Sequence, residues 1–360
     1  MNKTETREFL QDLIRIPSDS RDTTAQRGIQ KTITAMLISR EPLLAVTCQS
    51  EVKHPWTLIR SPQSSGNMLI FACHVDTVPI GDESDWTHPP FAAVIANGRI
   101  HGRGSVDMKG GIAVAAAALL TAAKLGRNVG LLLTSDEEVG SLGASGAATS
   151  LVGQEVGAVI IPEATENKVI LGHRGAMWLR LRSVGLAAHG STPERGVNAA
   201  QKIFKALERA IDELPLTSNA QLGKESWNLG ILESGTAPNI VPELAHATID
   251  MRTVTDGLAL RDWWERQPEI DHVETLLELP PLRTEVSAWT DSLPAAVTST
   301  PAPYFTDGSI ISKSLPGVPV IIWGPGEPAQ MHARDESLGI DSLDEAYDHF
   351  QHVVISCDAL

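Results

Sequence analysis

The feature that most constrains the fold is a set of short apolar runs that alternate with helical stretches in the first half of the chain. Three of these runs are almost free of polar residues, and they cover residues 68–75, 129–134 and 158–163. A continuous apolar run of this length is typical of a strand that is covered on both faces. Since strands that alternate with helices indicate an open α/β sheet, we expect an α/β domain here.

Residue periodicity predicts the other elements of this part of the chain. Helices are expected over residues 4–16, 24–39, 108–125 and 141–151, and further strands over residues 43–48 and 55–60. After a Pro-rich junction at residues 293–303, a buried strand returns at 318–325 and a last helix covers 341–356. We therefore expect residues 1–171 and 288–360 to form one domain with a mixed, open sheet.

The pattern changes near residue 169. Residues 176–184 alternate apolar and polar side chains, which is typical of an antiparallel strand with one exposed face. The remaining elements of this block are predicted as helices at 196–213 and 257–266 and strands at 226–233, 244–252 and 271–280. We therefore predict that residues 172–287 form a smaller α+β module inserted into the first domain.

Composition excludes several classes of protein. The net charge of −15, without a cluster of Lys or Arg, argues against a nucleic-acid binder, because such binding needs a basic surface. The longest apolar stretch, residues 111–123, is shorter than the ~18 residues of a membrane helix. The charged N-terminus lacks the pattern of a signal peptide, so we expect a cytoplasmic protein. Cys48, Cys73 and Cys357 are too scattered to indicate a disulfide framework or a Cys-based zinc site.

Candidate functional residues lie just beyond the predicted strands, where open α/β sheets bind ligands. His74 and Asp76 fall on one face of the strand end, because side chains in a strand alternate with a period of two. An imidazole can bind a zinc-like metal while a carboxylate accepts its other N–H and fixes the tautomer. The alternative is a strand-end histidine held locally by Asp76.

A second candidate is the acidic turn around Asp107, which glycines flank on both sides between residues 102 and 111. Glycine permits unusual backbone geometry and close approach. The segment does not match a phosphate-binding loop. The alternative is that Asp107 only caps the helix that follows.

The third candidate is the acidic run Asp136-Glu137-Glu138, which follows the strand at residues 129–134. Adjacent carboxylates repel each other unless a cation or a proton intervenes. One of two such acids can bind a metal while the other moves a proton. The alternative is that they only favour the N-terminus of the next helix.

Glu163 after the strand at 158–163 and His332 in a Pro/Gly loop after the last strand are weak signals individually. Together, five loops that follow buried strands each offer a histidine or an acid. Two histidines and several carboxylates, with no cysteine, form the ligand set expected for a pair of divalent ions.

With these motifs in place, the chain resembles the M20 family of co-catalytic zinc peptidases and deacylases. The resemblance extends over about residues 8–356, with the motifs in family order. The matching segments are CHVDTVP, WTHPPF, GRGSVDMKGGIA, TSDEEVGS, PEAT, AAHGSTPERGVNA, APNIVPE and QMHARDE.

The resemblance implies a role for each candidate ligand. Asp107 would bridge two metal ions, His74 and Glu163 would complete one site, and Glu138 and His332 would complete the other. The metal expected is zinc, and cobalt or manganese also suits this set of oxygen and nitrogen ligands.

The resemblance also implies the catalytic groups. Glu137 would act as general base and then as general acid, and Asp76 would orient His74. His189 would donate a hydrogen bond to the tetrahedral oxyanion from the inserted module of a partner subunit, which implies a homodimer formed through that lid or dimerisation domain. The peptide bond between Asp107 and Met108 is expected to be cis.

Arg174, Asn239 and Arg252 resemble positions that bind a substrate carboxylate in the desuccinylase and deacetylase branch. Arginine suits this role because its planar guanidinium can donate two parallel hydrogen bonds to a carboxylate. The turn at residues 306–309, around Gly308, could add backbone N–H donors. The alternative for Arg252 is an ion pair with Asp250 or another surface acid.

The function expected is hydrolysis of the amide bond of an N-acyl amino acid by a metal-activated water, as in the deacetylases and desuccinylases of the family. A dipeptidase or carboxypeptidase with the same metals is the first alternative. The second is a binding protein that has lost catalysis, which the presence of Glu137 beside all five ligand positions argues against. The partner expected is a small acyl amino acid or dipeptide, with no nucleic acid and no membrane.

Overall fold

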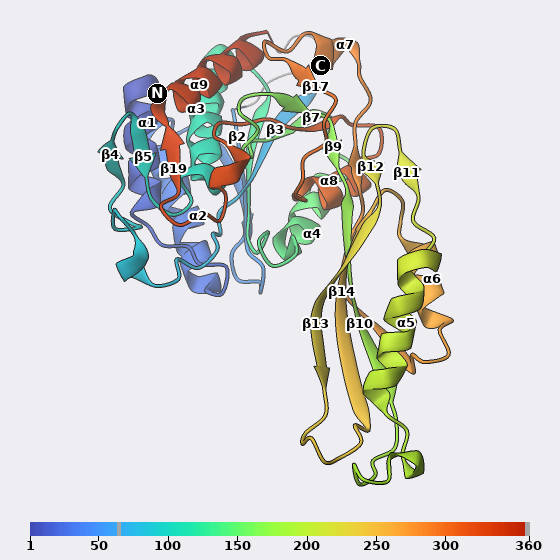
Figure 1. Ribbon diagram of the computed structural model, residues 1–360. Coiled ribbons are helices and arrows are strands. Elements are labelled where there is room, and N and C mark those ends of the chain that lie inside the picture. The colour runs from blue at the N-terminus through green and yellow to red at the C-terminus, as the bar shows by residue number, and fades with distance from the viewer. Residues whose placement is uncertain (63–65, 357–360) are drawn as a thin grey trace. The chain divides into compact units, whose positions relative to one another are not determined.

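The chain divides into two compact units, shown as ribbons in Figure 1. The computed structural model describes residues 1–62 and 66–356, so Cys357 lies outside the described residues. The first unit comprises Met1–Gly172, Leu282–Ala302 and Thr306–Leu360, and the second comprises His173–Pro281 and Pro303–Phe305. The assignment of residues 172–287 as a lid or dimerisation domain stays a prediction.

Eight strands of the described residues form one mixed sheet in the first unit (Figure 1). In order across the sheet they are β1 (Ala45–Gln49), β2 (Trp56–Arg60), β6 (Val129–Thr134), β3 (Met68–His74), β7 (Val156–Ile161), β18 (Val320–Ile322), β8 (Val169–Ile170) and β17 (Val297–Thr298). Strands β6, β3, β7 and β18 run parallel, whereas β1 and β2 pair antiparallel at one edge. The predicted mixed α/β sheet is therefore confirmed.

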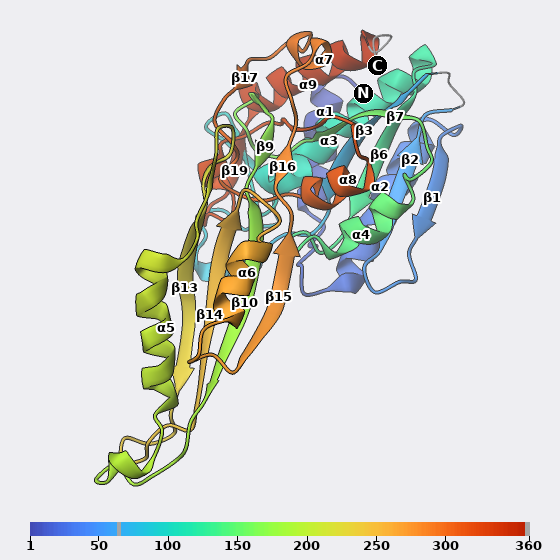
Figure 2. The same ribbon diagram turned by 90° about the vertical axis from the view of Figure 1, so that its right-hand side faces the viewer.

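Helices cover both faces of this sheet (Figures 1 and 2). They are α1 (Lys3–Ile14), α2 (Thr23–Arg40), α3 (Gly110–Leu125), α4 (Leu142–Thr149), α7 (Ala288–Asp291), α8 (Gly308–Ser314) and α9 (Ile340–Ile355). Helix α3 packs against α1 and α9, and α4 packs against α8. Because both faces are covered, every residue of β3 and β6 is buried, which explains their continuous apolar sequences.

Helix α3 lies in the core of the first unit. The longer stretch Ser105–Leu125 is apolar and long enough to cross a membrane by length and composition, which differs from our expectation from the sequence. However, 89% of its most apolar window is buried inside the protein. Burial of this kind is typical of a core helix, and the alanines of α3 allow it to pack closely on its neighbours.

A small antiparallel sheet beside the main one brings distant segments together. It consists of β4 (Val94–Ala96), β5 (Arg99–His101) and β19 (Ser337–Gly339), in the order β19-β5-β4. Ser337 pairs with His101 in this sheet. The turn that follows β5 and the loop that precedes β19 therefore leave from neighbouring strands. These two segments carry Asp107 and His332.

The second unit has a four-stranded antiparallel sheet in the order β13-β14-β10-β15 (Figure 2). Its elements are β10 (Gly175–Val184), α5 (Ala199–Glu213), β11 (Ser218–Asn219), β12 (Gly223–Lys224), β13 (Ser226–Ser234), β14 (Leu244–Thr253), α6 (Leu258–Glu265) and β15 (His272–Leu279). Helix α5 packs on β10 and β14. Buried and less buried residues alternate along β14, so one face of the sheet forms the core with α5 and α6.

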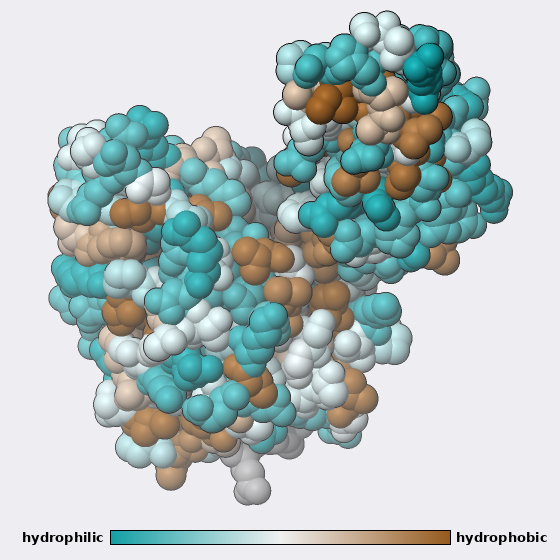
Figure 3. Space-filling model, turned by 90° about the horizontal axis from the view of Figure 1, so that it is seen from below, coloured by the Kyte–Doolittle hydropathy of each residue, from teal (hydrophilic) through white to brown (hydrophobic). Residues whose placement is uncertain are grey.

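The surface of the second unit also carries apolar side chains. Phe204 and Ile211 on α5 are 56% and 72% exposed, and Leu186 and Ile231 are 57% and 54% exposed. On the face shown in Figure 3, apolar patches lie among hydrophilic side chains. Single exposed apolar residues are common on protein surfaces, so they do not by themselves indicate an interface. The predicted homodimer stays a prediction.

Candidate metal centre and active site

Four of the predicted residues lie at the same edge of the main sheet. Strands β6, β3 and β7 are parallel neighbours, so their carboxyl ends meet there. His74 is the last residue of β3, Glu137 and Glu138 follow β6, and Glu163 follows β7. These side chains therefore lie close together because the three strands that precede them run in the same direction.

Asp107 reaches the same edge from an irregular helical turn, η2 (Ser105–Lys109), just before α3. Its peptide bond with Met108 is cis, which confirms the expectation from the sequence. Gly104 begins this turn with a φ of 79°, and a Cβ at that position would lie 2.7 Å from the Thr77 methyl group. Glycine is therefore required there, both for the backbone angle and for the close approach.

The carboxylate of Asp107 lies at the centre of the cluster. Its Oδ1 is 3.0 Å from His74 Nε2, and its Oδ2 is 3.2 Å from His332 Nε2. Glu163 Oε1 is 3.0 Å from His74 Nε2, and Glu138 Oε2 is 2.9 Å from His332 Nε2. Each oxygen of Asp107 thus contacts a separate histidine, and each histidine has its own glutamate.

These five residues differ in their access to solvent. The side chains of His74, Asp107, Glu163 and Glu138 are between 1% and 6% exposed, whereas that of His332 is 54% exposed. His332 comes from a loop, and its own φ of 58° lies in the left-handed region. The loop therefore supplies the one ligand candidate that solvent reaches.

Asp76 contacts both the histidine and the acidic loop. His74 Nδ1 lies 2.9 Å from the Asp76 carbonyl oxygen and 3.6 Å from its carboxylate. The carboxylate accepts hydrogen bonds from the backbone N–H groups of Glu137 and Glu138, each at 3.1 Å. The carbonyl of Asp76 thus lies closer to the His74 ring than its carboxylate does, and the carboxylate holds the backbone of the acidic loop. The role of Asp76 in orienting His74 stays a prediction.

The two histidines have strongly perturbed pKa values. Burial by itself lowers the pKa of His74, but its hydrogen bonds with Asp107, Asp76 and Glu163 outweigh burial and hold the pKa well above its usual value. Hydrogen bonds with Asp107 and Glu138 raise the pKa of His332 to about 10. The carboxylates around His74 and His332 therefore favour a positive charge at the two histidines.

The pKa values of the glutamates are raised as well, but for an acid this rise disfavours the charged form. Burial raises the pKa of Glu163 to about 7 and that of Glu138 above its usual value, and Asp107 adds repulsion to both. Burial also raises the pKa of Glu137 well above the usual value, with further repulsion from Asp307. A buried carboxyl group whose pKa approaches neutrality can take up and release a proton during a reaction.

The donors of this cluster suit divalent cations, and ligand atoms of His74, Asp107 and Glu138 lie within 4.8 Å of one another. Carboxylate oxygens and imidazole nitrogens without thiolates suit zinc, cobalt or manganese. Glu138 Oε1 and Glu163 Oε2 are buried and have no hydrogen-bond partner among the described residues. A buried carboxylate oxygen without a partner is unfavourable, and ligation of a cation would compensate it.

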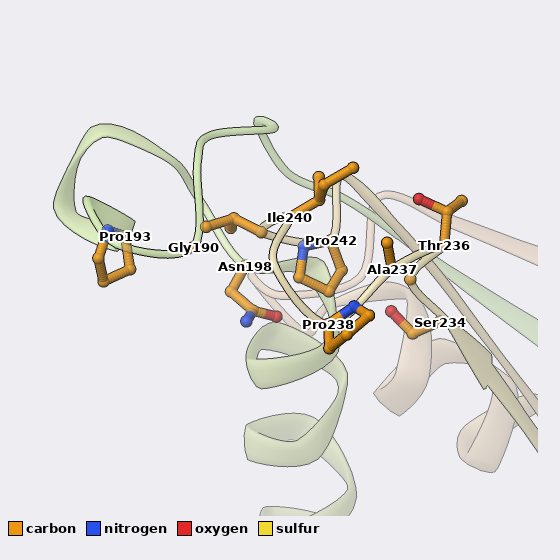
Figure 4. A pocket seen from close by; sticks show the side chains of 11 residues that line it. Gly190, Pro193, Asn198, Ser234, Thr236, Ala237, Pro238, Ile240 and Pro242 are labelled. Carbon is orange, nitrogen blue, oxygen red and sulfur yellow. The ribbon is translucent and has the colours of Figure 1, made fainter.

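His189 and Asn239 lie close together in the second unit. Gly190 donates its N–H to the Asn239 carbonyl oxygen at 2.7 Å. The backbone N–H of Ser191 donates to His189 Nδ1 at 3.1 Å, so Nδ1 acts as an acceptor and the ring proton lies on Nε2. A pocket of about 520 Å³ lies beside these residues, between residues 190–198 and 234–242 (Figure 4). Nε2–H is thus available as a donor.

Arg174 and Arg252 make contacts within the second unit. Arg174 Nη1 donates to the Lys224 carbonyl oxygen and to Ser226 Oγ, each at 3.0 Å. Arg252 Nη2 is 3.0 Å from Asp250 Oδ2, which is the ion pair considered as an alternative from the sequence. This pair does not exclude a role with substrate, because a guanidinium has five N–H donors and Asp250 accepts from Nε and Nη2.

Gly308 and Ser309 direct their backbone N–H groups to Thr306 within the turn at residues 306–309. The Gly308 N–H donates to Thr306 Oγ1 at 3.1 Å, and Ser309 N donates to the Thr306 carbonyl oxygen at 3.1 Å. These two amides would have to exchange their partners within the turn in order to bind a substrate. A donor role for Gly308 stays a prediction.

Three further residues support the site and received no role from the sequence. Asp307 is buried near Glu137, and burial raises its pKa to about 6. Gln26 exchanges two hydrogen bonds of 3.0 Å with Asp136, directly before Glu137. Glu336 accepts hydrogen bonds from the turn that carries Asp107. Glu336 lies within the quoted motif QMHARDE, which could have drawn attention to it, whereas no local pattern marks Gln26.

Comparison with known proteins relates this site to a family. Residues 70–356 match the family model of peptidase family M20/M25/M40. A probable succinyl-diaminopimelate desuccinylase of Staphylococcus epidermidis is 27% identical over 334 residues, which cover 79% of this chain and 82% of that protein.

Solved structures of similar fold cover nearly the whole chain. An M20 family metallo-carboxypeptidase from Sulfolobus solfataricus is 20% identical with a TM-score of 0.77, covering 97% of this chain and 98% of its own. The YXEP protein of Bacillus subtilis, a dinuclear metal-binding peptidase of the M20 family, is 14% identical with a TM-score of 0.70, covering 99% and 98%. At these identities the structural matches establish the fold alone.

Proposed function

Because the chain belongs to peptidase family M20/M25/M40, we propose that it is a two-metal hydrolase that cleaves the amide bond of an N-acyl amino acid. Membership of the family makes the chain a hydrolytic enzyme that acts on a peptide or another small molecule. The observation that carries the two-metal proposal is the position of Asp107, whose two oxygens contact two separate histidine–glutamate pairs.

In this proposal His74, Asp107 and Glu163 hold one cation, and Asp107, Glu138 and His332 hold the other. When bound, the two cations lower the pKa of a water molecule and polarise the scissile carbonyl group. We propose zinc as the native metal, since its usual ligands are those that the cluster offers.

Glu137 is proposed as the proton carrier of the reaction. It takes the proton of the attacking water and donates it to the nitrogen of the leaving amine. Two features support this role. Its side chain is buried at the same sheet edge as the ligands, with a raised pKa, and the hydrogen bond from its backbone to Asp76 fixes its position.

His189 is proposed to donate a hydrogen bond to the tetrahedral oxyanion. The support from the structure is its tautomer, because Nδ1 accepts from Ser191 and leaves the proton on Nε2. We propose that His189 acts on the active site of a partner subunit, in a homodimer formed through residues 172–287. Asn239 would lie beside it in the same loops.

The acyl amino acid specificity rests on two considerations. The desuccinylase relative is named for a succinyl substrate, which carries a free carboxylate. Arg174 and Arg252 are the candidates for a carboxylate partner, because guanidinium groups bind carboxylates with two parallel hydrogen bonds. A cytoplasmic location would agree with such a metabolic substrate and stays a prediction.

A carboxypeptidase or dipeptidase is the second candidate. It is favoured by the solved structures of similar fold, which include a metallo-carboxypeptidase and a metal-binding peptidase. Both candidates use the same metal ligands and the same Glu137, so they differ only in substrate. A binding protein without catalysis would have no need of Glu137.

Hydrolysis of a substrate panel distinguishes these candidates. The panel holds N-acetyl and N-succinyl derivatives of basic, acidic and apolar amino acids, together with dipeptides, and each is incubated with zinc, cobalt or manganese. Glu137→Gln protein serves as the control for contaminating activity. Release of free amine from the acyl amino acids, lost on chelation, is the expected result. Cleavage of dipeptides alone would favour the second candidate, and no cleavage of any substrate would contradict the proposal.

A further inference from the structure

The buried carboxylate of Glu336 accepts four hydrogen bonds from a single short segment of the chain. Its Oε2 accepts from Arg103 Nη1 and from Gly104 N, each at 2.8 Å. Its Oε1 accepts from Val106 N at 2.7 Å and from Asp107 N at 3.1 Å. The side chain is fully buried, so these contacts are not shared with solvent.

These donors come from the turn that ends at Asp107. Three of the four are backbone N–H groups, so Glu336 fixes the path of the main chain and does more than neutralise Arg103. The last bond is made to the amide of Asp107 itself. Because Asp107 lies between the two histidine–glutamate pairs, a displacement of its main chain would move its carboxylate relative to both.

Glu336 also belongs to the segment that carries His332, four residues earlier in the sequence. The Glu336 carbonyl oxygen accepts from Gly102 N at 2.9 Å, and Arg103 Nη1 also donates to the Ala333 carbonyl oxygen at 3.2 Å. Arg103 and Glu336 thus join the turn that carries Asp107 to the loop that carries His332. Their side chains contact each other, and each residue also has a hydrogen bond with the main chain of the other segment.

We propose that Glu336 is a positioning residue that holds Asp107 at the correct distance from His332, and thereby sets the affinity of the metal position that these two residues share with Glu138. The inference rests on the proposed function, since it takes these residues as metal ligands. It assigns no chemical step to Glu336, which acts only through the main chain of its neighbours.

Chemistry explains why a carboxylate is needed at this position. Four N–H donors converge on two oxygens, and an ionised carboxylate is an acceptor at both. A glutamine has the same shape but replaces one oxygen with an NH₂ group, which would face two donors. Glu336→Gln therefore breaks half of the contacts without creating a cavity.

The test measures zinc binding by wild-type, Glu336→Gln and Glu327→Gln proteins, using calorimetric titration of metal-free protein and a chromogenic chelator as competitor. Glu327→Gln is the matched control. Glu327 lies in the same stretch of chain and pairs with Arg99 at 2.9 Å, but it is partly exposed and has no hydrogen bond to the turn at 103–107. Melting temperatures of the metal-free proteins report on stability separately.

We expect two zinc ions per chain in the wild type and in Glu327→Gln. In Glu336→Gln one zinc should bind with a Kd raised about 10- to 100-fold, the range typical for partners that orient a metal ligand. Activity of this variant should recover as zinc is raised, which a purely structural role would not produce. Zinc Kd values equal to those of the wild type in folded Glu336→Gln would overturn the inference.

Failure of the proposed function gives a different result, because wild-type protein would then bind no zinc. Should Glu336→Gln yield no folded protein, Glu336→Asp is the second variant. It keeps the ionised carboxylate but shortens the side chain by one methylene group, which withdraws the carboxylate from the three backbone N–H groups of the turn. A rise in zinc Kd is expected for it, and an unchanged Kd in the folded variant would likewise overturn the inference.

Discussion

Gly111, in the first turn of α3, supports the candidate metal centre through its lack of a side chain. A Cβ at this position would lie 2.2 Å from the Pro162 carbonyl oxygen and 2.7 Å from Pro162 Cβ. Pro162 directly precedes Glu163, one of the predicted ligands. We therefore predict that Gly111→Ala both destabilises the protein and displaces Glu163 from the cluster.

The size of the effect follows from comparison with Gly28, an exposed glycine in helix α2. A Cβ there meets nothing within 4 Å, so Gly28→Ala should stabilise the protein by about 0.5–1 kcal/mol, the usual gain of alanine over glycine in a helix. Gly111→Ala has the same gain, but overpacking of a buried site costs about 1–3 kcal/mol. The difference between the two variants should therefore be about 1–3 kcal/mol in favour of Gly28→Ala.

Urea denaturation of the metal-free proteins measures this difference, and zinc titration of the folded variants measures the displacement of Glu163. Gly111→Ala should bind zinc more weakly than the wild type, whereas Gly28→Ala should bind it equally well. A Gly111→Ala protein that is as stable as Gly28→Ala and binds zinc normally would refute the reasoning, because Pro162 could then yield without effect on the site.

Three further predictions concern single residues. Glu137→Gln should retain its zinc but lose turnover by about 10²- to 10⁴-fold, as metal analysis and steady-state kinetics would record; loss of metal with activity would show that Glu137 is misassigned. His189→Ala should lower kcat by about 10²- to 10³-fold without change in zinc content, and an unchanged kcat would remove His189 from the mechanism. Burial lowers the pKa of His173 to about 4, below the usual value of about 6.5, so the unfolded chain binds more protons between these values and stability falls as pH decreases. About 2 kcal/mol should be lost between pH 6.5 and pH 5, and urea denaturation of His173→Gln should show a correspondingly smaller dependence on pH.

Elements with a strong periodic pattern could be predicted from the sequence. The strand expected at 129–134 coincides with β6, and the helix expected at 24–39 matches α2 within one residue. Strand β17 and helix α8 were missed, because two residues are too few for the period of a strand and seven residues are only about two turns of a helix. The pairing of β5 with β19 was also missed, since it joins residues more than 200 positions apart.

The same contrast holds for the candidate site. His74, Glu137 and Glu163 could be placed because each follows a buried parallel strand, and strand direction brings such residues to one edge. Asp107 and His332 could be named as candidates from their loops, but these loops carry no periodic signal, so their roles as ligands were implied only by the family resemblance. Supporting residues such as Glu336 could not be assigned a role from sequence, because their hydrogen bonds connect distant segments that only the folded chain brings together.

The most direct test of the account is the number of metal ions that the protein binds and the dependence of hydrolysis on them. Purified protein is stripped with a chelator and titrated with zinc, and hydrolysis of N-acyl amino acids is followed at each addition. The account predicts two ions per chain, with activity lost on stripping and restored as the sites fill. Hydrolysis that persists in the stripped protein, or a chain that binds no zinc, would contradict it.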